Sequence, residues 1–307
     1  MNPFASPPDL GVLGQTLNGY WIGEIPIKVG PTTTGPPPPD GWGEATKAFC
    51  MQYDHVIYVG RKYSAQVTTT IDSAEWRAIA YLLTWYYPPA DNDAAAKLQV
   101  AIWRLLNNTR GYNYVNPSWV PSDIDNAAKA LVNLALGKDV VRGDDTFEWV
   151  KPVSGNLTSI LADPGDIVTL TARITMVNGT GRANVKVQFS ATKDGSPLAV
   201  SSTEIHTNST GYAQVTVTVP PASIGSNIEV KASTRGVWPK VYLDLSGCPD
   251  PQDLIGFNTS YQLTVSTNVW ILATIHVIPE VPLGTLAIVA TCFSAYIVKA
   301  KKAKLTK

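Results

Sequence analysis

Residues 1 to about 145 combine strand-like and helix-like spacing of apolar positions. Residues 20–29 alternate apolar and polar side chains, as a half-buried strand does. Residues 49–60 and 63–70, rich in Val, Ile, Tyr and Thr, predict two further strands joined by a turn near Gly60. The segment PTTTGPPPPDGWG holds too many prolines and glycines for regular pairing and indicates an exposed loop. Strands are therefore expected before the first helix.

Three helices are predicted after these strands. From residue 74 to 87, apolar side chains recur every three or four positions, which is the period of one helix face. Asp72 and Glu75 have the spacing of a capping box at its start. Asp93 can cap a second helix that is apolar around most of its circumference, which indicates burial against several neighbours. Ser122 can cap a third.

The pattern changes at about residue 147 to short alternating segments alone. Five of them are separated by Gly, Pro, Asn and Asp turns at the spacing of a β-sandwich: residues 167–177, 183–191, 199–206, 213–219 and 228–233. Residues 237–245 and 261–277 add strands around a connection that contains Cys248. This second unit is therefore predicted to be all-β.

The C-terminal residues have the composition of a membrane segment. Residues 281–298 contain no charged side chain and are about long enough to cross a slightly thin bilayer as a helix. Five lysines and no acidic residue follow in the last nine positions. The positive-inside rule places this tail in the cytoplasm and residues 1–280 outside. A buried helix of a soluble protein is the weaker alternative, because such helices rarely end in KAKKAKLTK.

An outer domain requires export, and two terminal features bear on it. The first residues, MNPFASPPDLGVLG, lack the basic start and apolar run of a signal peptide, so we expect a leader to be missing from this sequence. Residues 278–284, IPEVPLG, followed by the apolar span and the basic tail, resemble the three-part C-terminal sorting signals of archaeal surface proteins. That resemblance implies cleavage of the span and its replacement by a lipid, and a retained transmembrane helix is the equal alternative.

Composition narrows the function further. The 24 basic residues balance the 24 acidic ones, so net charge does not suggest a nucleic-acid partner. The sequence has no metal-ligand cluster, phosphate loop or nucleotide fingerprint, and neither metal nor cofactor is expected. Cys292 lies in the apolar span, so Cys50 and Cys248 leave one disulfide at most. Five N-x-S/T sequons are candidate N-glycosylation sites: Asn107, Asn156, Asn178, Asn208 and Asn258.

Two short stretches carry the candidate chemistry. In AFCMQYD the lone Cys50 follows an aromatic residue, and in KLQVAIWRLLN Gln99 comes just before an Ala-Ile-Trp helical face. This pair resembles the Cys-Gln pair of TQXA-type thioester domains on microbial surface adhesins, over roughly residues 18–140. Leu98 stands where that family usually has a threonine, and Met51 where a small residue is expected.

The resemblance implies a stored acyl group. Attack of the Cys50 thiolate on the side-chain amide of Gln99 expels ammonia and leaves an internal thioester, which requires near-attack geometry and exclusion of water. Phe49 and Trp103 are suited to exclude water. An amine or hydroxyl on a surface protein or glycan can then take the acyl group and become joined to Gln99, with Cys50 as the leaving group. Such a protein is a single-use acyl donor and not a turnover enzyme.

The second unit resembles the bacterial Ig-like repeats that form adhesin stalks, on the runs PGDIVTLTARI, VNGTGRANVKVQFSA, TNSTGYAQVTV and IEVKAS. The expected architecture is an α+β thioester-type head (1–145), an all-β Ig-like sandwich (146–278), a transmembrane or sorting segment (279–298) and a basic cytoplasmic tail (299–307). The predicted function is that of a membrane-anchored cell-surface adhesin that attaches covalently to its partner.

Three alternatives stay open. In the first, the chain is a structural or non-covalent binding protein of the cell envelope in which no thioester forms. In the second, Cys50 and Cys248 form a disulfide in the oxidising exterior and consume the nucleophile; their placement in different predicted units argues against this. In the third, Cys50 serves a Cys-His protease, which its strand position and the opposite facing of His55 disfavour.

Overall fold

The computed structural model describes most of the two predicted units. The described residues are 14–17, 20–27, 46–52, 65–69, 72–107, 114, 118–151, 159–221, 226–244 and 253–271. The predicted membrane segment (279–298) and basic tail (299–307) lie outside them, as do His55, Asn156 and Cys248. Among the described residues, no helix has the length and apolar character needed to cross a bilayer.

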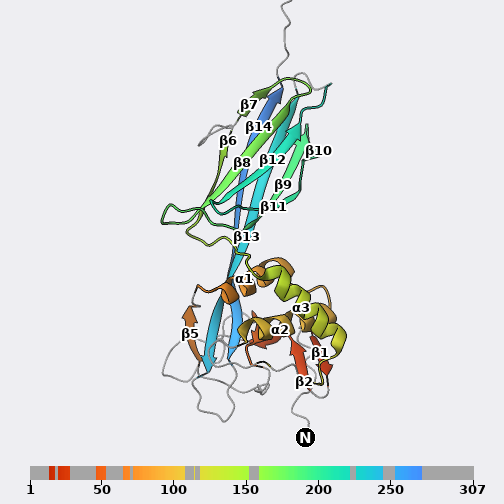
Figure 1. The fold of residues 1–307 in the computed structure, drawn as a ribbon, viewed down its shortest axis with the longest axis vertical. Coiled ribbons are helices and arrows are strands. Elements are labelled where there is room, and N and C mark those ends of the chain that lie inside the picture. Colours follow the sequence, from red (N-terminus) through yellow and green to blue (C-terminus); the bar gives the residue numbers. More distant parts are fainter. Residues whose placement is uncertain are drawn as a thin grey trace, which may run out of the picture.

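The molecule is elongated, with helices at one end and a β-sandwich at the other (Figure 1). We call the end with α1–α3 and β1–β5 the helical region and the end with β6–β12 the sandwich region. Two long strands, β13 (Asn227–Asp244) and β14 (Leu254–Ile271), run through both. The chain therefore has the mixed α+β composition expected from its sequence, with three helices and mainly antiparallel sheets.

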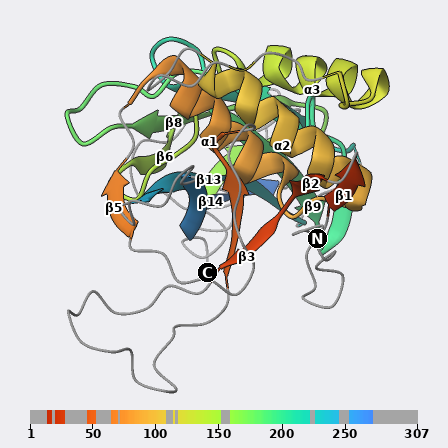
Figure 2. The same cartoon turned by 90° about the horizontal axis from the view of Figure 1, so that it is seen from below.

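The three predicted helices are present in the helical region. They are α1 (Ala74–Tyr86), α2 (Asn92–Leu106) and α3 (Ser122–Ala135). Viewed along the long axis, they lie together on one side of the strands (Figure 2). Ser122 is the first residue of α3 and not its cap, because Pro121 occupies the capping position without a side-chain hydrogen bond.

The caps of the first two helices differ from the predicted residues. Ser73, and not Asp72, caps α1, and its hydroxyl accepts the N–H of Trp76. Asp91, and not Asp93, caps α2. In both cases a second polar residue nearby has nearly the right spacing, so periodicity alone does not choose between them.

Five strands accompany the helices: β1 (Gly14–Leu17), β2 (Tyr20–Gly23), β3 (Ile25–Ile27), β4 (Thr46–Cys50) and β5 (Ala65–Thr69). The single strand predicted for residues 20–29 is therefore divided at Glu24. Gly23 has a φ of 144°, a backbone conformation that residues with side chains rarely adopt, which explains the division.

Seven strands lie in the sandwich region: β6 (Thr146–Lys151), β7 (Ser159–Ala162), β8 (Ile167–Thr175), β9 (Lys186–Lys193), β10 (Ser196–Leu198), β11 (Glu204–His206) and β12 (Tyr212–Thr218). One sheet joins β12, β8 and β6, and the other joins β10 and β11 to β9 and continues through β13 and β14 to β7. Leu170 and Val215 of the first sheet and Val187 and Val230 of the second are almost fully buried in one core. The two sheets therefore pack on each other as a β-sandwich.

The β13–β14 hairpin joins the two regions through one sheet. Near the far end it pairs with β9 and β7, and near its turn it pairs with β5 and β4. The predicted boundary at residue 145 therefore separates β4 and β5 from the strands that pair with them. Segments 228–233 and 237–245, expected as two strands, are one, with an irregular register between Val237 and Pro239.

A second contact between the regions is a buried ion cluster. Arg182 of the sandwich region, 5% exposed, binds Asp145 through Nε and Nη2 at 2.6 and 2.8 Å. Its Nη1 lies 3.1 Å from a carboxylate oxygen of Asp139, which follows α3. Burial raises the pKa of Asp139 despite the nearby guanidinium. Two carboxylates thus compensate one buried cation at the junction.

Candidate functional site

The strand β4 ends at Cys50, and the backbone N–H and C=O of this residue are not directed at the neighbouring strand β14. Met51 donates its N–H to the carbonyl of Asp253, at 3.0 Å, and hydrogen-bonded positions alternate along an antiparallel ladder. The N–H and C=O of Cys50 therefore point away from β14. On the other edge, β3 pairs with β4 only as far as Ile25, opposite Ala48. The backbone of Cys50 lies beyond the end of that pairing.

The side-chain amide of Gln99, in α2, lies beside the Cys50 backbone on this edge of β4. Its Oε1 accepts the N–H of Cys50 at 2.9 Å, and its Nε2 donates to the carbonyl of Cys50 at 2.7 Å. The amide thus replaces the backbone of a neighbouring strand. Gln99 is completely buried and Cys50 is 7% exposed, so both hydrogen bonds are shielded from water.

This reciprocal contact brings the two sequence-predicted residues together across 49 positions. The two hydrogen bonds close a ring that contains Cα of Cys50 and the amide carbon Cδ of Gln99, and the sulfur is attached to that Cα through Cβ. The Cys50 sulfur, as candidate nucleophile, and the Gln99 amide carbon, as candidate electrophile, are therefore both positioned by the same hydrogen-bonded ring. The covalent bond between them stays a prediction.

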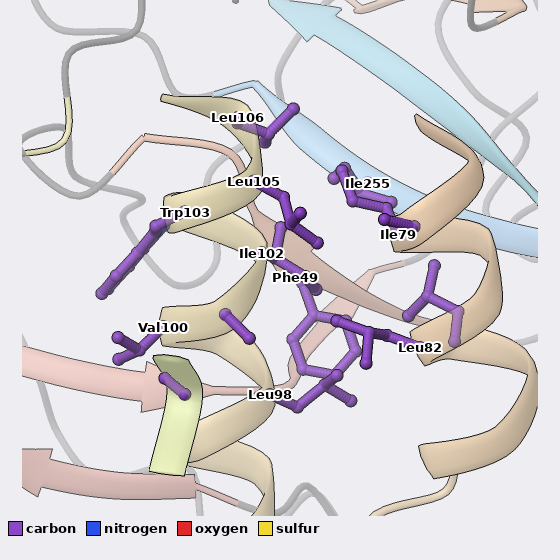
Figure 3. Close-up of a cluster of buried hydrophobic side chains, with 14 of the residues drawn as sticks. Phe49, Ile79, Leu82, Leu98, Val100, Ile102, Trp103, Leu105, Leu106 and Ile255 are labelled. Atoms are coloured by element: carbon purple, nitrogen blue, oxygen red, sulfur yellow. The ribbon is translucent and has the colours of Figure 1, made fainter. Parts of the chain in front are cut away.

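Phe49 forms the apolar support on one face of β4. It is completely buried between α1 and α2, among Leu82, Leu98 and Ile255 (Figure 3), and its ring meets that of Tyr87 edge-on at 6.4 Å. Since successive side chains of a strand point to opposite faces, Phe49 excludes water from the face of β4 that is turned away from the Cys50 side chain.

Trp103 supports the site from α2. It follows Gln99 by four residues, so the two side chains share one face of the helix. Trp103 is 4% exposed and stacks on Tyr114 at a centroid distance of 6.2 Å. In Figure 3 its ring points away from Phe49. The two aromatic residues predicted to exclude water therefore lie on different sides of the α2 helix.

The two positions at which the sequence differs from the thioester-domain pattern that it resembles are both core positions. Leu98 and Met51 are each 1% exposed and belong to the apolar cluster of the helical region. A polar residue at position 98 would therefore need a buried hydrogen-bond partner, while leucine fills the space beside Phe49 (Figure 3). Leu98 and Met51 are therefore both suited to a tightly packed apolar core around the Cys50–Gln99 pair.

A buried charge beside the site was not found from the sequence. Glu24 is completely buried and accepts a hydrogen bond from Lys47 Nζ at 2.8 Å. Burial, together with the nearby Glu24 carboxylate, raises the pKa of Tyr87 to about 12. The three groups gather on the Phe49 side of β4. Only the β3–β4 register reveals this cluster, because nothing in the local spacing distinguishes Glu24 from a surface residue.

The candidate glycosylation sites have different surroundings. Asn178 and Asn208 are exposed in turns, and the side-chain oxygen of each accepts the N–H and hydroxyl of the threonine two residues later. Asn107 lies at the end of α2, where its oxygen accepts the N–H of Tyr114. Asn258 lies in β14, and its side chain is outside the described part, as is Asn156. Modification at all five stays a prediction.

The sequence has three histidines, any of which a Cys-His protease could use, and the structure describes one of them. His206 lies on β11, with Nε2 3.4 Å from the hydroxyl of Tyr81 in α1, whereas His55 and His276 are outside the described residues. Within the part of the chain that the structure describes, no three His, Cys, Asp or Glu side chains form a group that could hold a metal ion.

Comparison with known proteins returns structural likenesses alone. No protein-family model and no curated protein sequence matches the chain. The Bacillus anthracis TIE protein is similar with 14% identity and a TM-score of 0.31, over 74% of this chain and 42% of its own length. The thioester domain of the Enterococcus faecium TIE86 protein is similar with 16% identity and a TM-score of 0.28, over 82% of this chain and 96% of that domain. TM-scores this low do not establish a shared fold.

Proposed function

We propose that the protein is a cell-surface adhesin that stores an acyl group as an internal thioester between Cys50 and Gln99 and transfers it once to a partner. The observation that carries the proposal is the pair of reciprocal hydrogen bonds between the Gln99 amide and the Cys50 backbone. They hold both reacting residues in one buried place, which lowers the entropic part of the barrier to an intramolecular reaction.

The same contacts suit the chemistry of bond formation. As the Cys50 sulfur attacks Cδ, negative charge develops on Oε1, which already faces the N–H of Cys50 at 2.9 Å. The C–N bond of the amide then breaks, and the thiol proton leaves with Nε2 as ammonia. The thiol and the amide are thereby converted to a thioester and one ammonia, with no oxidant, metal or cofactor in the balance.

Transfer reverses the role of the sulfur. A lysine amine or a hydroxyl of a surface protein or glycan attacks the acyl carbon, the C–S bond breaks, and Cys50 leaves as the thiol after taking the proton of the nucleophile. The partner is then joined to Gln99 by an amide or ester. Burial of both residues protects the stored bond from hydrolysis until a partner enters.

The surrounding chain fits the presentation of such a site outside a membrane. The sandwich region is an elongated support for the helical region (Figure 1). The uncharged residues 281–298 and the five lysines after them support a membrane anchor with a cytoplasmic tail. We include location at the cell surface and N-glycosylation in this proposal.

A non-covalent role is the second candidate, and one observation favours it. The amide of Gln99 has both of its polar groups hydrogen-bonded, as a buried structural glutamine does. In that case Gln99 ties α2 to the end of β4, and the protein binds or supports other envelope components without forming a covalent bond.

Intact-mass measurement separates the two candidates. The thioester predicts that the purified protein is lighter than its sequence mass by one ammonia and that methylamine adds to it with opening of the bond. Cys50→Ala removes both effects. A full sequence mass, together with alkylation of Cys50 in the folded protein, would contradict the thioester.

The same measurement tests the disulfide alternative. Asp253, adjacent to the β14 start, contacts Met51, and β14 pairs with both β4 and β13, so Cys50 lies in the same sheet as the two strands between which Cys248 stands in the sequence. The predicted boundary at residue 145 therefore does not keep the two cysteines apart. A Cys50–Cys248 disulfide lowers the mass by two hydrogens and is reversed by a reductant, whereas the thioester responds to methylamine and not to mild reduction.

A further inference from the structure

The residues just after Cys50 are fastened to the beginning of the last described strand. Besides the hydrogen bond from Met51 to the Asp253 carbonyl, Asp253 donates its own N–H to Oε1 of Gln52 at 2.9 Å. Gln52 is half-buried, so this bond is partly shielded from competing water. The two bonds form a clamp on the β14 side of β4, which we call the β4–β14 clamp.

The β4–β14 clamp lies on the opposite edge of β4 from the Gln99 amide. Cys50 is therefore held between Gln99 on one edge and the start of β14 on the other. The next residue of β14, Ile255, is completely buried opposite Phe49 and packs near Ile79 of α1 (Figure 3). Displacement of β14 would break the hydrogen bonds from Met51 to Asp253 and from Asp253 to Gln52 that hold this edge of β4.

We infer that Gln52 and Asp253 are positioning residues that hold Cys50 against Gln99, so that the thioester closes only after β14 has joined the helical region. This inference rests on the proposed function. Asp253 follows Gln52 by 201 positions, so the clamp cannot form until nearly all of the described chain has been made. Bond closure is thereby delayed until β6–β13, all of which precede Asp253 in the chain, have been made.

The chemistry supports such a delay. Closure requires the sulfur to remain in near-attack geometry, and an unpaired strand end samples many geometries in which water reaches the amide. A reactive acyl group formed on an incomplete chain would be exposed to hydrolysis and to unintended amines. Fixing β4 from its second edge couples formation of the bond to completion of the fold.

Refolding of the full chain tests this role. Chains recovered unfolded, with Gln99 intact, are diluted from denaturant, and ammonia loss is followed by intact mass while folding is followed by circular dichroism. Gln52→Met removes the side-chain amide, and with it the acceptor of the Asp253 N–H, with little change in volume. Loss of the bond to Asp253 should slow ammonia loss about tenfold without slowing refolding. Gln52→Glu keeps an oxygen that can accept the Asp253 N–H, so ammonia loss should occur at nearly the original rate.

The controls separate this inference from the proposed function. Gln262→Met makes the same change at an exposed position of β14 and should leave closure unchanged. Closure of Gln52→Met at the original rate, or equal slowing in Gln52→Glu, would overturn the positioning role while leaving the thioester intact. If the unaltered protein never loses ammonia, the proposed function itself fails. Should Gln52→Met not refold, Gln52→Asn, which keeps the amide but shortens its reach, takes its place and should slow closure similarly.

Discussion

At the scale of single residues, the buried amide of Gln99 has a requirement that a carboxyl group cannot meet. Its Nε2 donates to the Cys50 carbonyl at 2.7 Å, and an ionised carboxylate would place two acceptors face to face. In a Cys50→Ala background, which keeps the backbone groups and cannot form a thioester, Gln99→Glu should lower the free energy of unfolding by about 1–3 kcal/mol at pH 7. Chemical denaturation measures the difference.

The pH dependence of this loss identifies its cause. Burial should raise the pKa of the introduced carboxyl group above its unfolded value of about 4.3, so the folded state holds the proton more tightly. The deficit is then small at low pH, where the protonated group can donate, and grows as pH rises through the raised pKa. Gln262→Glu, the same change at an exposed site, should cost less than about 0.5 kcal/mol. Equal losses at both sites would contradict the assignment.

Residues of the site could be predicted from the sequence where a local motif marks them. They could not be predicted where only the pairing of distant strands brings them to the site. Cys50 and Gln99 stand in short recognisable stretches, and the structure brings them into contact. Glu24 and Gln52 have no local signal, because their partners come from other strands and, for Gln52, from 201 positions away. Spacing alone cannot supply a contact whose register is set by tertiary pairing.

At the scale of elements, α1 is attached to the sandwich region by aromatic and cationic side chains. The ring of Trp85 is contacted by Lys186 Nζ and Arg235 Cζ, at 4.2 and 4.7 Å from the ring centroid. Nearby, Tyr81 of α1 meets His206 of β11 with ring centroids 6.1 Å apart. These contacts fix the direction of the helical region relative to the strands that carry it.

This attachment should weaken in mild acid through His206. Burial, with Lys138 and Lys186 nearby, lowers the pKa of His206, while Glu204 acts in the opposite sense and Tyr81 is neutral. The unfolded chain then binds a proton at higher pH than the folded one, so stability is full above about pH 6.5 and falls as pH drops below it. The loss should be less than about 1 kcal/mol between pH 7.5 and 5.

Denaturation of His206→Gln over the same range provides the check. The variant should lose less stability than the original protein, and because His55 and His276 remain in both, the difference belongs to position 206. Carboxylates with lowered pKa, such as Glu204, lose their contribution only below about pH 4.5, outside this window. Parallel profiles for the two proteins would exclude His206 as the source.

Elements with an uninterrupted period were predictable, and the element that joins the two regions was not. The periods of α1, α2 and β12 appear at the expected positions. β13 was expected as two pieces, residues 228–233 and 237–245, with Gly236 between them and Pro239 inside the second. The structure shows why both are tolerated: a Cβ at Gly236 would lie 2.0 Å from the Val141 carbonyl, and Pro239 follows the irregular register, where a missing N–H is accommodated.

At the scale of the whole molecule, the β13–β14 hairpin makes the two regions depend on each other. Val241 and Ile255 belong to the core of the helical region, whereas Val230 and Ile228 on the same hairpin belong to the core of the sandwich region. Separation of the regions would divide a hairpin with continuous pairing from Asn227 to Tyr242, apart from one irregularity. We therefore expect one cooperative unfolding transition instead of two.

A core substitution at the far end of the hairpin tests this coupling. Val230→Ala removes two methyl groups from a completely buried site and should destabilise the protein by about 1–3 kcal/mol. Hydrogen exchange in increasing denaturant should then show α2 and β8 opening at the same lowered midpoint, although α2 lies at the other end of the molecule. Lys231→Ala, at the exposed neighbouring position, should leave both midpoints within about 0.5 kcal/mol. If β8 opened earlier while α2 kept its original midpoint, the hairpin would join two independently stable units, and the stored acyl group would survive loss of the sandwich.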